Sequence, residues 1–204
     1  MAHIPDGLLS APVLVGGGLL AAAGVALGLR RLDERMIPRT ALLAAAFFAG
    51  SLVAVPVGPS SVHLLLAGLM GVMLGTAAFL AVLVALLLQA LLFGFGGLTT
   101  LGVNTVNIAL PGVLCGLALG PLIRATARPS VRLAAGALAG GLAVLGTGGL
   151  VALSLWLSSS DYVPAARVVI ATYLPLALVE AFVTAAIIAF LARVQPGALR
   201  PVAP

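Results

Sequence analysis

Long apolar runs, separated by short charged or Pro- and Gly-rich stretches, dominate the chain. Five of them have about the length of a membrane-spanning helix: 8–29, 40–55, 108–123, 133–157 and 168–191. The run at 62–93 is about 48 Å long as a helix, against about 30 Å for the hydrocarbon core of a bilayer. Dividing it near Gly75-Thr76 gives two short spans, and the stretch 94–107 is then a loop. The pattern therefore predicts seven transmembrane helices.

The composition supports a membrane protein over a soluble domain. Of the 204 residues, 62% are hydrophobic and 7% are charged, whereas a soluble domain has about 25% charged residues. We therefore expect an all-α integral membrane protein with one membrane domain. In it, residues 1–7 are an extramembrane N-terminal segment, 8–193 contain the spans and 194–204 form a tail.

The arginines indicate how the chain lies in the membrane. With seven spans, nine of the ten Arg fall on one side, in the loops at 30–39 and 124–132 and in the tail, and only Arg167 is opposite. The positive-inside rule then places the C-terminus in the cytoplasm and the N-terminus outside, in a plasma membrane protein. Ten scattered Arg reflect this orientation better than nucleic-acid binding. The chain has no Lys, so it lacks the P-loop lysine of a nucleotide hydrolase.

The two histidines, His3 and His63, fall on the same extracytoplasmic side of this map. Two imidazoles at one membrane face are consistent with a metal site. They are too few to define one, and hydrogen-bonded interfacial histidines are the simpler interpretation of their spacing.

The N-terminus offers further nitrogen donors, and a square-planar set of nitrogens suits Ni²⁺ or Cu²⁺. If Met1 is removed, the Ala2 amine, the His3 amide and imidazole, and His63 make four donors. If Met1 stays, the terminal amine, two amides and the His3 imidazole already make four, and His63 is redundant or axial. Asp6 either accepts a hydrogen bond from His3 or caps the first span, and Asn104 either lines a lid over the site or forms a turn.

Three stretches of the chain resemble the signatures of one known family. Residues 1–10 (MAHIPDGLLS), 60–69 (SSVHLLLAGL) and 89–104 (QALLFGFGGLTTLGVN) are similar to those of the nickel/cobalt substrate-binding subunits of energy-coupling factor (ECF) transporters, the NikM/CbiM family. Residues 175–180 resemble a weaker C-terminal signature. The resemblance implies an extra N-terminal helix on a six-helix core. It also implies metal ligands at Ala2, His3 and His63, and it is closer to the nickel branch.

The resemblance implies a substrate-capture subunit for nickel, with Ni²⁺ as transported substrate and no permanently bound cofactor. The implied partners are a transmembrane coupling subunit and two cytoplasmic ATPases. A stripe of small residues at Ala41, Ala45 and Ala49 is a candidate docking face. Cobalt capture, a stand-alone divalent-cation permease and a metal sensor are the alternatives. We expect no enzyme, since neither an H-E-x-x-H nor a G-x-S-x-G motif occurs.

Overall fold

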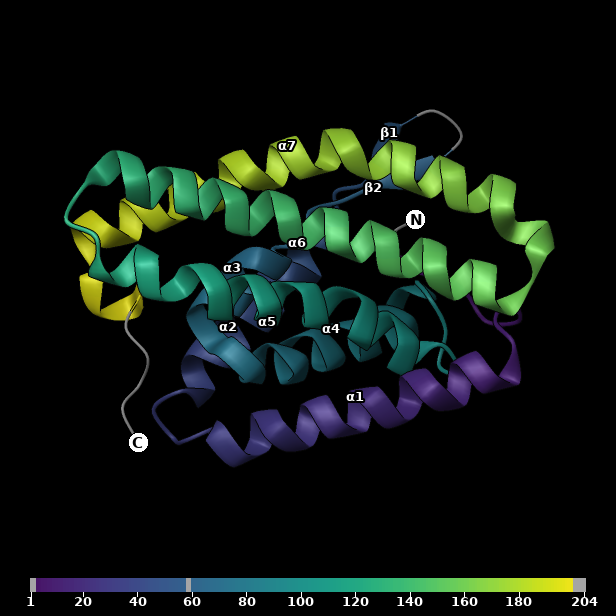
Figure 1. Ribbon diagram of the computed structural model, residues 1–204. Helices are drawn as coiled ribbons and strands as arrows, with labels where there is room; N and C mark the ends of the chain where they lie inside the picture. The colour runs from purple at the N-terminus through teal and green to yellow at the C-terminus, as the bar shows by residue number, and fades with distance from the viewer. Residues whose placement is uncertain (1–2, 58–59, 200–204) are drawn as a thin grey trace.

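A computed structural model describes residues 3–57 and 60–199 of the chain. Seven α-helices account for most of it: α1 (Ala11–Arg31), α2 (Ile37–Ser51), α3 (Ala67–Leu74), α4 (Ala78–Phe93), α5 (Leu101–Ala125), α6 (Pro129–Ser158) and α7 (Val163–Val194). Short 3-10 turns lie at Gly75–Ala77, Ser160–Tyr162 and Pro196–Leu199. In Figure 1, α6 and α7 lie side by side along one edge of the molecule, α1 lies along the opposite edge, and α3, α4 and α5 lie between them.

The exterior of this bundle is apolar. Leu19, Leu42, Leu178 and Phe182 each expose about two thirds or more of their surface, at 68%, 71%, 76% and 75%. Five helical stretches are long and apolar enough to cross a membrane: Ala11–Arg31, Ala67–Phe93, Leu101–Ala125, Pro129–Ser158 and Ser160–Val194. Large apolar side chains on the outside suit a chain whose solvent is lipid. The all-helical membrane fold predicted from the sequence agrees with this arrangement.

The chain reverses direction at Gly75, where the sequence predicted a division. Gly75 has φ +56° and ψ −130°, outside the helical region, and separates α3 from α4. His63, before α3, and Gly96, after α4, both lie against His3. A straight helix over 67–93 would hold its ends about 40 Å apart. The two halves therefore fold back on each other. Because α3 has only eight residues, the count of seven membrane crossings stays a prediction.

Glycines allow the central helices to approach closely. A Cβ at Gly71 of α3 would overlap the backbone of Gly112 on α5, and one at Gly116 would overlap the backbone of Gly71. On α6, Gly140 lies in the same way against α7, next to Thr184. Small residues that let backbones touch are the main device of helix packing in lipid. Gly71, Gly116 and Gly140 therefore lie where these helices meet.

The segment predicted as a loop becomes helical partway along, and a short hairpin follows α2. The stretch at 94–107 becomes helical at Leu101, so Asn104 lies on α5 and not in a loop. Its polar residues Asn104, Thr105 and Asn107 are buried, and Gly102 lies against Gly18 of α1. The stretch at 55–62 forms a hairpin of β1 (Val55–Val57) and β2 (Ser60–Val62), which pair antiparallel.

The arginines and the histidines lie at opposite ends of the bundle. Arg30 and Arg31, at the end of α1, line the same cavity as Arg124, at the end of α5. His3 and the loop that contacts it lie at the beginning of α5, 25 residues or about 37 Å of helix away. This separation agrees with the charge asymmetry of the sequence, and the direction in which the chain is inserted stays a prediction.

Candidate metal centre

His3 and His63 meet in the interior of the bundle, although sixty residues separate them. Their Nε2 atoms are 3.2 Å apart and their ring centroids 4.9 Å apart. Both side chains are buried, with 4% and 6% of their surface exposed. The structure therefore brings the two predicted histidines into contact, and their role as metal ligands stays a prediction. Ala2, the third predicted ligand, lies outside the described residues.

The hydrogen bonds determine which ring nitrogens carry lone pairs. His63 Nδ1 is 3.0 Å from the carbonyl oxygen of Leu64, which can only accept, so Nδ1 carries the proton and Nε2 the lone pair. His63 Nε2 then accepts from His3 Nε2–H. This leaves the lone pair on His3 Nδ1, which is buried and has no hydrogen-bond partner among the described residues. A buried acceptor without a partner costs about 1–3 kcal/mol and is a natural place for a cation.

Both imidazoles are held in the neutral form. Burial, and secondly the neighbouring His63, lower the pKa of His3 to about 3 from the usual 6.5, while the Gln89 side chain acts in the opposite direction. Burial also lowers the pKa of His63, against the opposing effect of its bond to Leu64. Neutral imidazole is the form that binds metal ions, so the pair is ready to bind at pH 7.

Phe47 and Gln89 complete the surroundings of the pair. The fully buried Phe47 ring of α2 lies 6.4 Å from the His3 ring and 6.3 Å from the His63 ring, between centroids. Gln89 of α4 is also fully buried, and neither of its amide atoms has a hydrogen-bond partner of ordinary geometry in the described ranges. Together they give the histidines an apolar wall and one polar neighbour, Gln89, whose side chain interacts with His3.

The first turn of α5 holds the backbone next to His3. Asn104 makes two hydrogen bonds with Ile4: its Oδ1 accepts from the Ile4 N–H, and its Nδ2 donates to the Ile4 carbonyl, both at 3.0 Å. Thr100 Oγ1 donates to the same carbonyl at 2.8 Å. Asn104 is therefore a clamp on the N-terminal segment, in place of the lid or turn residue expected from the sequence. Thr100 was not predicted, because a lone threonine in a Gly-rich stretch carries no signal.

Asp6 binds the turn that precedes α5, in place of the bond to His3 or the cap on the first span that the sequence predicted. Its carboxylate accepts hydrogen bonds from the backbone N–H groups of Leu98, Thr99 and Thr100 at 3.0–3.3 Å, and from the Thr99 hydroxyl. The Thr99 hydroxyl is the main cause that lowers the pKa of Asp6. The carboxylate therefore satisfies three backbone N–H groups of the turn that leads into α5. Asp6 thus ties the N-terminal segment to α5, as Asn104 does.

Glu180 of α7 positions the other histidine. Its Oε1 accepts hydrogen bonds from the backbone N–H groups of Leu65 and Leu66, the latter at 2.9 Å. Leu66 has φ +52°, the only non-glycine residue with a positive φ among those described. The buried carboxylate stabilises this unfavourable conformation three residues after His63. The sequence marked Glu180 as unusual for a span, but not its partner 115 residues away.

No group of three or more His, Cys, Asp or Glu side chains that could hold a metal occurs in the described part of the chain. A site at the histidine pair therefore needs donors other than these side chains. The His3 backbone nitrogen and the N-terminal amine are the nearest candidates along the chain.

Comparison with known proteins gives consistent matches over nearly the whole chain. Residues 3–198 match a family model described as "Cobalt uptake substrate-specific transmembrane region". A "Putative metal transport protein" of Haemophilus influenzae is 39% identical over 95% of both chains. A "Putative fused nickel transport protein NikMN" of Archaeoglobus fulgidus is 31% identical over 95% of this chain and 66% of its own length. The crystal structure of a truncated transition metal transporter superposes with a TM-score of 0.73 at 25% identity, covering 93% of this chain and 96% of that one.

Cobalt and nickel both occur in these descriptions, and the family is a transport component and not a class of enzyme. The apolar helices agree with a multi-pass protein of a prokaryotic plasma membrane. The chain belongs to the CbiM family of transmembrane metal-uptake components.

Proposed function

We propose that this chain is the substrate-capture subunit of an ATP-driven ECF-type nickel transporter. It binds Ni²⁺ at the outer face through the Ala2 amine, the His3 amide and imidazole, and His63. The observation that carries the proposal is the buried, unpartnered lone pair of His3 Nδ1 beside His63. This nitrogen can close a six-membered chelate ring with the backbone nitrogen of the same residue. Binding then exchanges the His3–His63 hydrogen bond for two bonds to the metal.

Nickel is favoured over cobalt by the kind of donors. Four nitrogens in a plane, one of them a deprotonated amide, suit Ni²⁺. In the described ranges, no third His, Cys, Asp or Glu side chain joins the buried pair to form a metal-binding group. A cobalt-specific site remains the alternative within the family, and competition between the two ions distinguishes them.

Proton release on binding tests this ligand set. At pH 7 the amide loses one proton and the α-amine about 0.9, because its usual pKa is about 8. The imidazoles release almost none, since His3 and His63 are already neutral. Titration calorimetry in buffers of different ionisation enthalpy should therefore give about two protons per nickel at pH 7. The affinity should fall about a hundredfold for each pH unit below 7.

Two outcomes of this titration contradict the proposal. Release of almost no protons at pH 7 means that the histidines bind without the amine and amide. A rise toward four protons at pH 5.5 means that both imidazoles keep their usual pKa and are not held neutral.

The partners form the second part of the proposal. The resemblance implies a coupling subunit and two ATPases, and Ala41, Ala45 and Ala49 are all exposed on α2. Such a stripe of small residues lets another helix approach closely. Among the described residues, Glu180 is the one carboxylate within the spans, and it is engaged with Leu65 and Leu66. These residues therefore offer no series of carboxylates along which a permease could pass a cation.

Co-purification and uptake test the partner face. Ala45→Trp should still bind nickel but lose the coupling subunit and the ATPases, and uptake by cells should fall to background. Ala134→Trp, on an exposed position of α6, is the matched control and should keep partners and uptake. Full nickel uptake by cells that express this chain alone would instead favour a stand-alone permease.

A further inference from the structure

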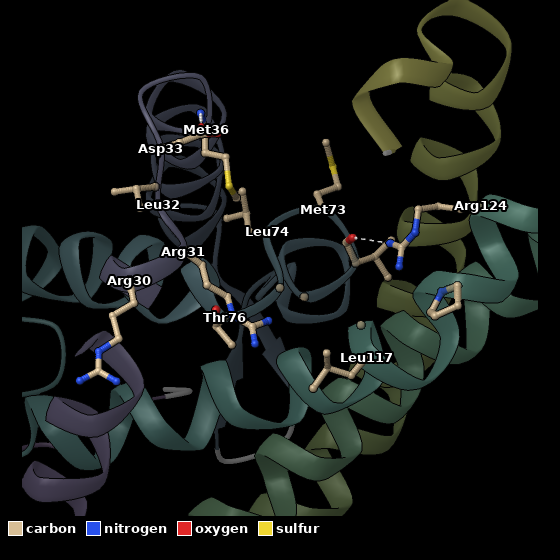
Figure 2. A pocket seen from close by; sticks show the side chains of 15 residues that line it. Arg30, Arg31, Leu32, Asp33, Met36, Met73, Leu74, Thr76, Leu117 and Arg124 are labelled. Atoms are coloured by element: carbon tan, nitrogen blue, oxygen red, sulfur yellow. Dashed lines mark hydrogen bonds between the residues drawn. The ribbon is translucent and has the colours of Figure 1, made fainter. Parts of the chain in front are cut away.

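A cavity lies at the arginine-bearing end of the bundle, far from the histidines. It has a volume of about 570 Å³ and lies between the end of α1, the turn that joins α3 to α4, and the second half of α5. Figure 2 shows Arg31 extending beside Thr76 and Arg124 on the other side of the cavity. The volume is in the range of small-molecule sites.

The charge of this cavity is strongly positive. Arg30, Arg31 and Arg124 line it, and none of them forms an ion pair with a carboxylate in the described part of the chain. Arg124 donates only a long hydrogen bond, 3.4 Å, to the carbonyl oxygen of Val72. The one carboxylate in the lining, Asp33, accepts a hydrogen bond from the Met36 N–H at 2.8 Å. Guanidinium groups left without carboxylates have their donors available for an anion.

Apart from these charged residues and Thr76, the lining is apolar. Leu32, Met36, Met73, Leu74 and Leu117 contribute side chains, and Gly71, Gly75 and Gly116 contribute backbone. A free phosphate ion would leave this part of a 570 Å³ space unused. A ligand with a charged head and a hydrocarbon portion fits both halves of the lining. Helix ends lie at the depth of lipid headgroups, and basic pockets between helices bind anionic ones.

We propose that this cavity binds one anionic phospholipid of the phosphatidylglycerol type. Arg31 and Arg124 hold the phosphate, and the first carbons of the acyl chains lie against Met36, Met73 and Leu117. The lipid then bridges the end of α1 and the end of α5 through contacts to both. This site is separate from nickel capture, since the two lie at opposite ends of α5.

Native mass spectrometry of the delipidated chain, with short-chain lipids as probes, tests the assignment. Dioctanoyl-phosphatidylglycerol should bind at least about tenfold more tightly than dioctanoyl-phosphatidylcholine, which carries no net charge. The double variant Arg31→Gln/Arg124→Gln should lose about 25-fold in affinity for the anionic lipid, about fivefold for each arginine. Arg35→Gln/Arg128→Gln removes the same charge from residues outside the cavity lining and should change the affinity less than threefold.

A second variant keeps the test valid if the arginine variant misfolds. Leu117→Trp fills the apolar part from an exposed position and leaves every charge in place, and it should also weaken lipid binding. Equal binding of the two lipids, or an equal loss in the control double variant, overturns the proposal in favour of a diffuse attraction. Displacement of the lipid by millimolar inorganic phosphate overturns it in favour of a small-anion site.

Discussion

Replacing His63 with alanine is expected to lower the nickel affinity by a factor of a hundred or more. Structural metal sites with four ligands gain about 10–16 kcal/mol in total, so each ligand contributes roughly 3 kcal/mol. His63 Nε2 is the one nitrogen of the proposed set that comes from outside the N-terminal segment, and it lies 3.2 Å from the His3 ring. Its loss also removes the contact that brings α3 to this segment.

Calorimetry on the purified variant measures the effect, and two further variants sharpen it. His63→Gly leaves a space the size of the lost ring, and added imidazole should restore part of the binding. His3→Ala removes the chelating ring and should also abolish binding. Unchanged nickel affinity in His63→Ala would show that the N-terminal residues chelate the ion alone. Intact mass would then be expected to show that Met1 is retained.

Asn104→Ala is expected to weaken nickel binding by roughly tenfold to a hundredfold without touching a ligand. Residues that orient metal ligands have effects of this size. Asn104 holds both backbone groups of Ile4, so its loss frees the residue directly after His3. Without this clamp the N-terminal segment is less ordered before the metal binds. The entropic cost of ordering it then reduces the free energy of binding.

Asn107→Ala is the matched control for this variant. Asn107 is equally buried on the same helix, but its only hydrogen bond is a long one of 3.4 Å from Ser154, and it has none to the N-terminal segment. It should keep the wild-type affinity within about threefold, while its thermal stability in detergent resembles that of Asn104→Ala. If the two variants bind nickel equally well, the clamp on Ile4 plays no part in capture.

The helices of this protein follow from its hydrophobic pattern to a large extent. The apolar runs and the arginine-bearing loops predict α1, α2, α6 and α7 to within a few residues at most ends. The excess length of the run at 62–93 predicts the reversal at Gly75. These features depend on local properties, namely length, charge and the absence of polar residues, which the sequence displays directly.

The beginning of α5 could not be predicted in the same way. In a soluble protein the residues Gly94 to Asn107 indicate a loop, because Gly, Thr and Asn favour turns. Inside a membrane bundle the same residues are small and polar enough to fill a tight helix contact, as Gly102 does against Gly18. Whether these residues form a loop or a closely packed helix depends on contacts with α1, which lies nearly ninety residues earlier in the chain.

In the candidate site, too, local features of the sequence could be interpreted directly, whereas contacts between distant residues could not. The charge map placed His3 and His63 on one side of the membrane, and the structure brings them together. The residues that hold them, Asn104, Asp6 and Glu180, act through partners about 90 to 115 positions away. Sequence spacing carries no sign of such contacts, so their roles required the fold.

X-ray absorption at the nickel edge of the loaded wild-type protein tests the central claim most directly. The account predicts one nickel per chain in a planar set of four nitrogen donors, with the outer-shell scattering of two imidazole rings. Six-coordinate nickel with mainly oxygen neighbours, or the signature of a single imidazole, would contradict a site built from the N-terminus, His3 and His63.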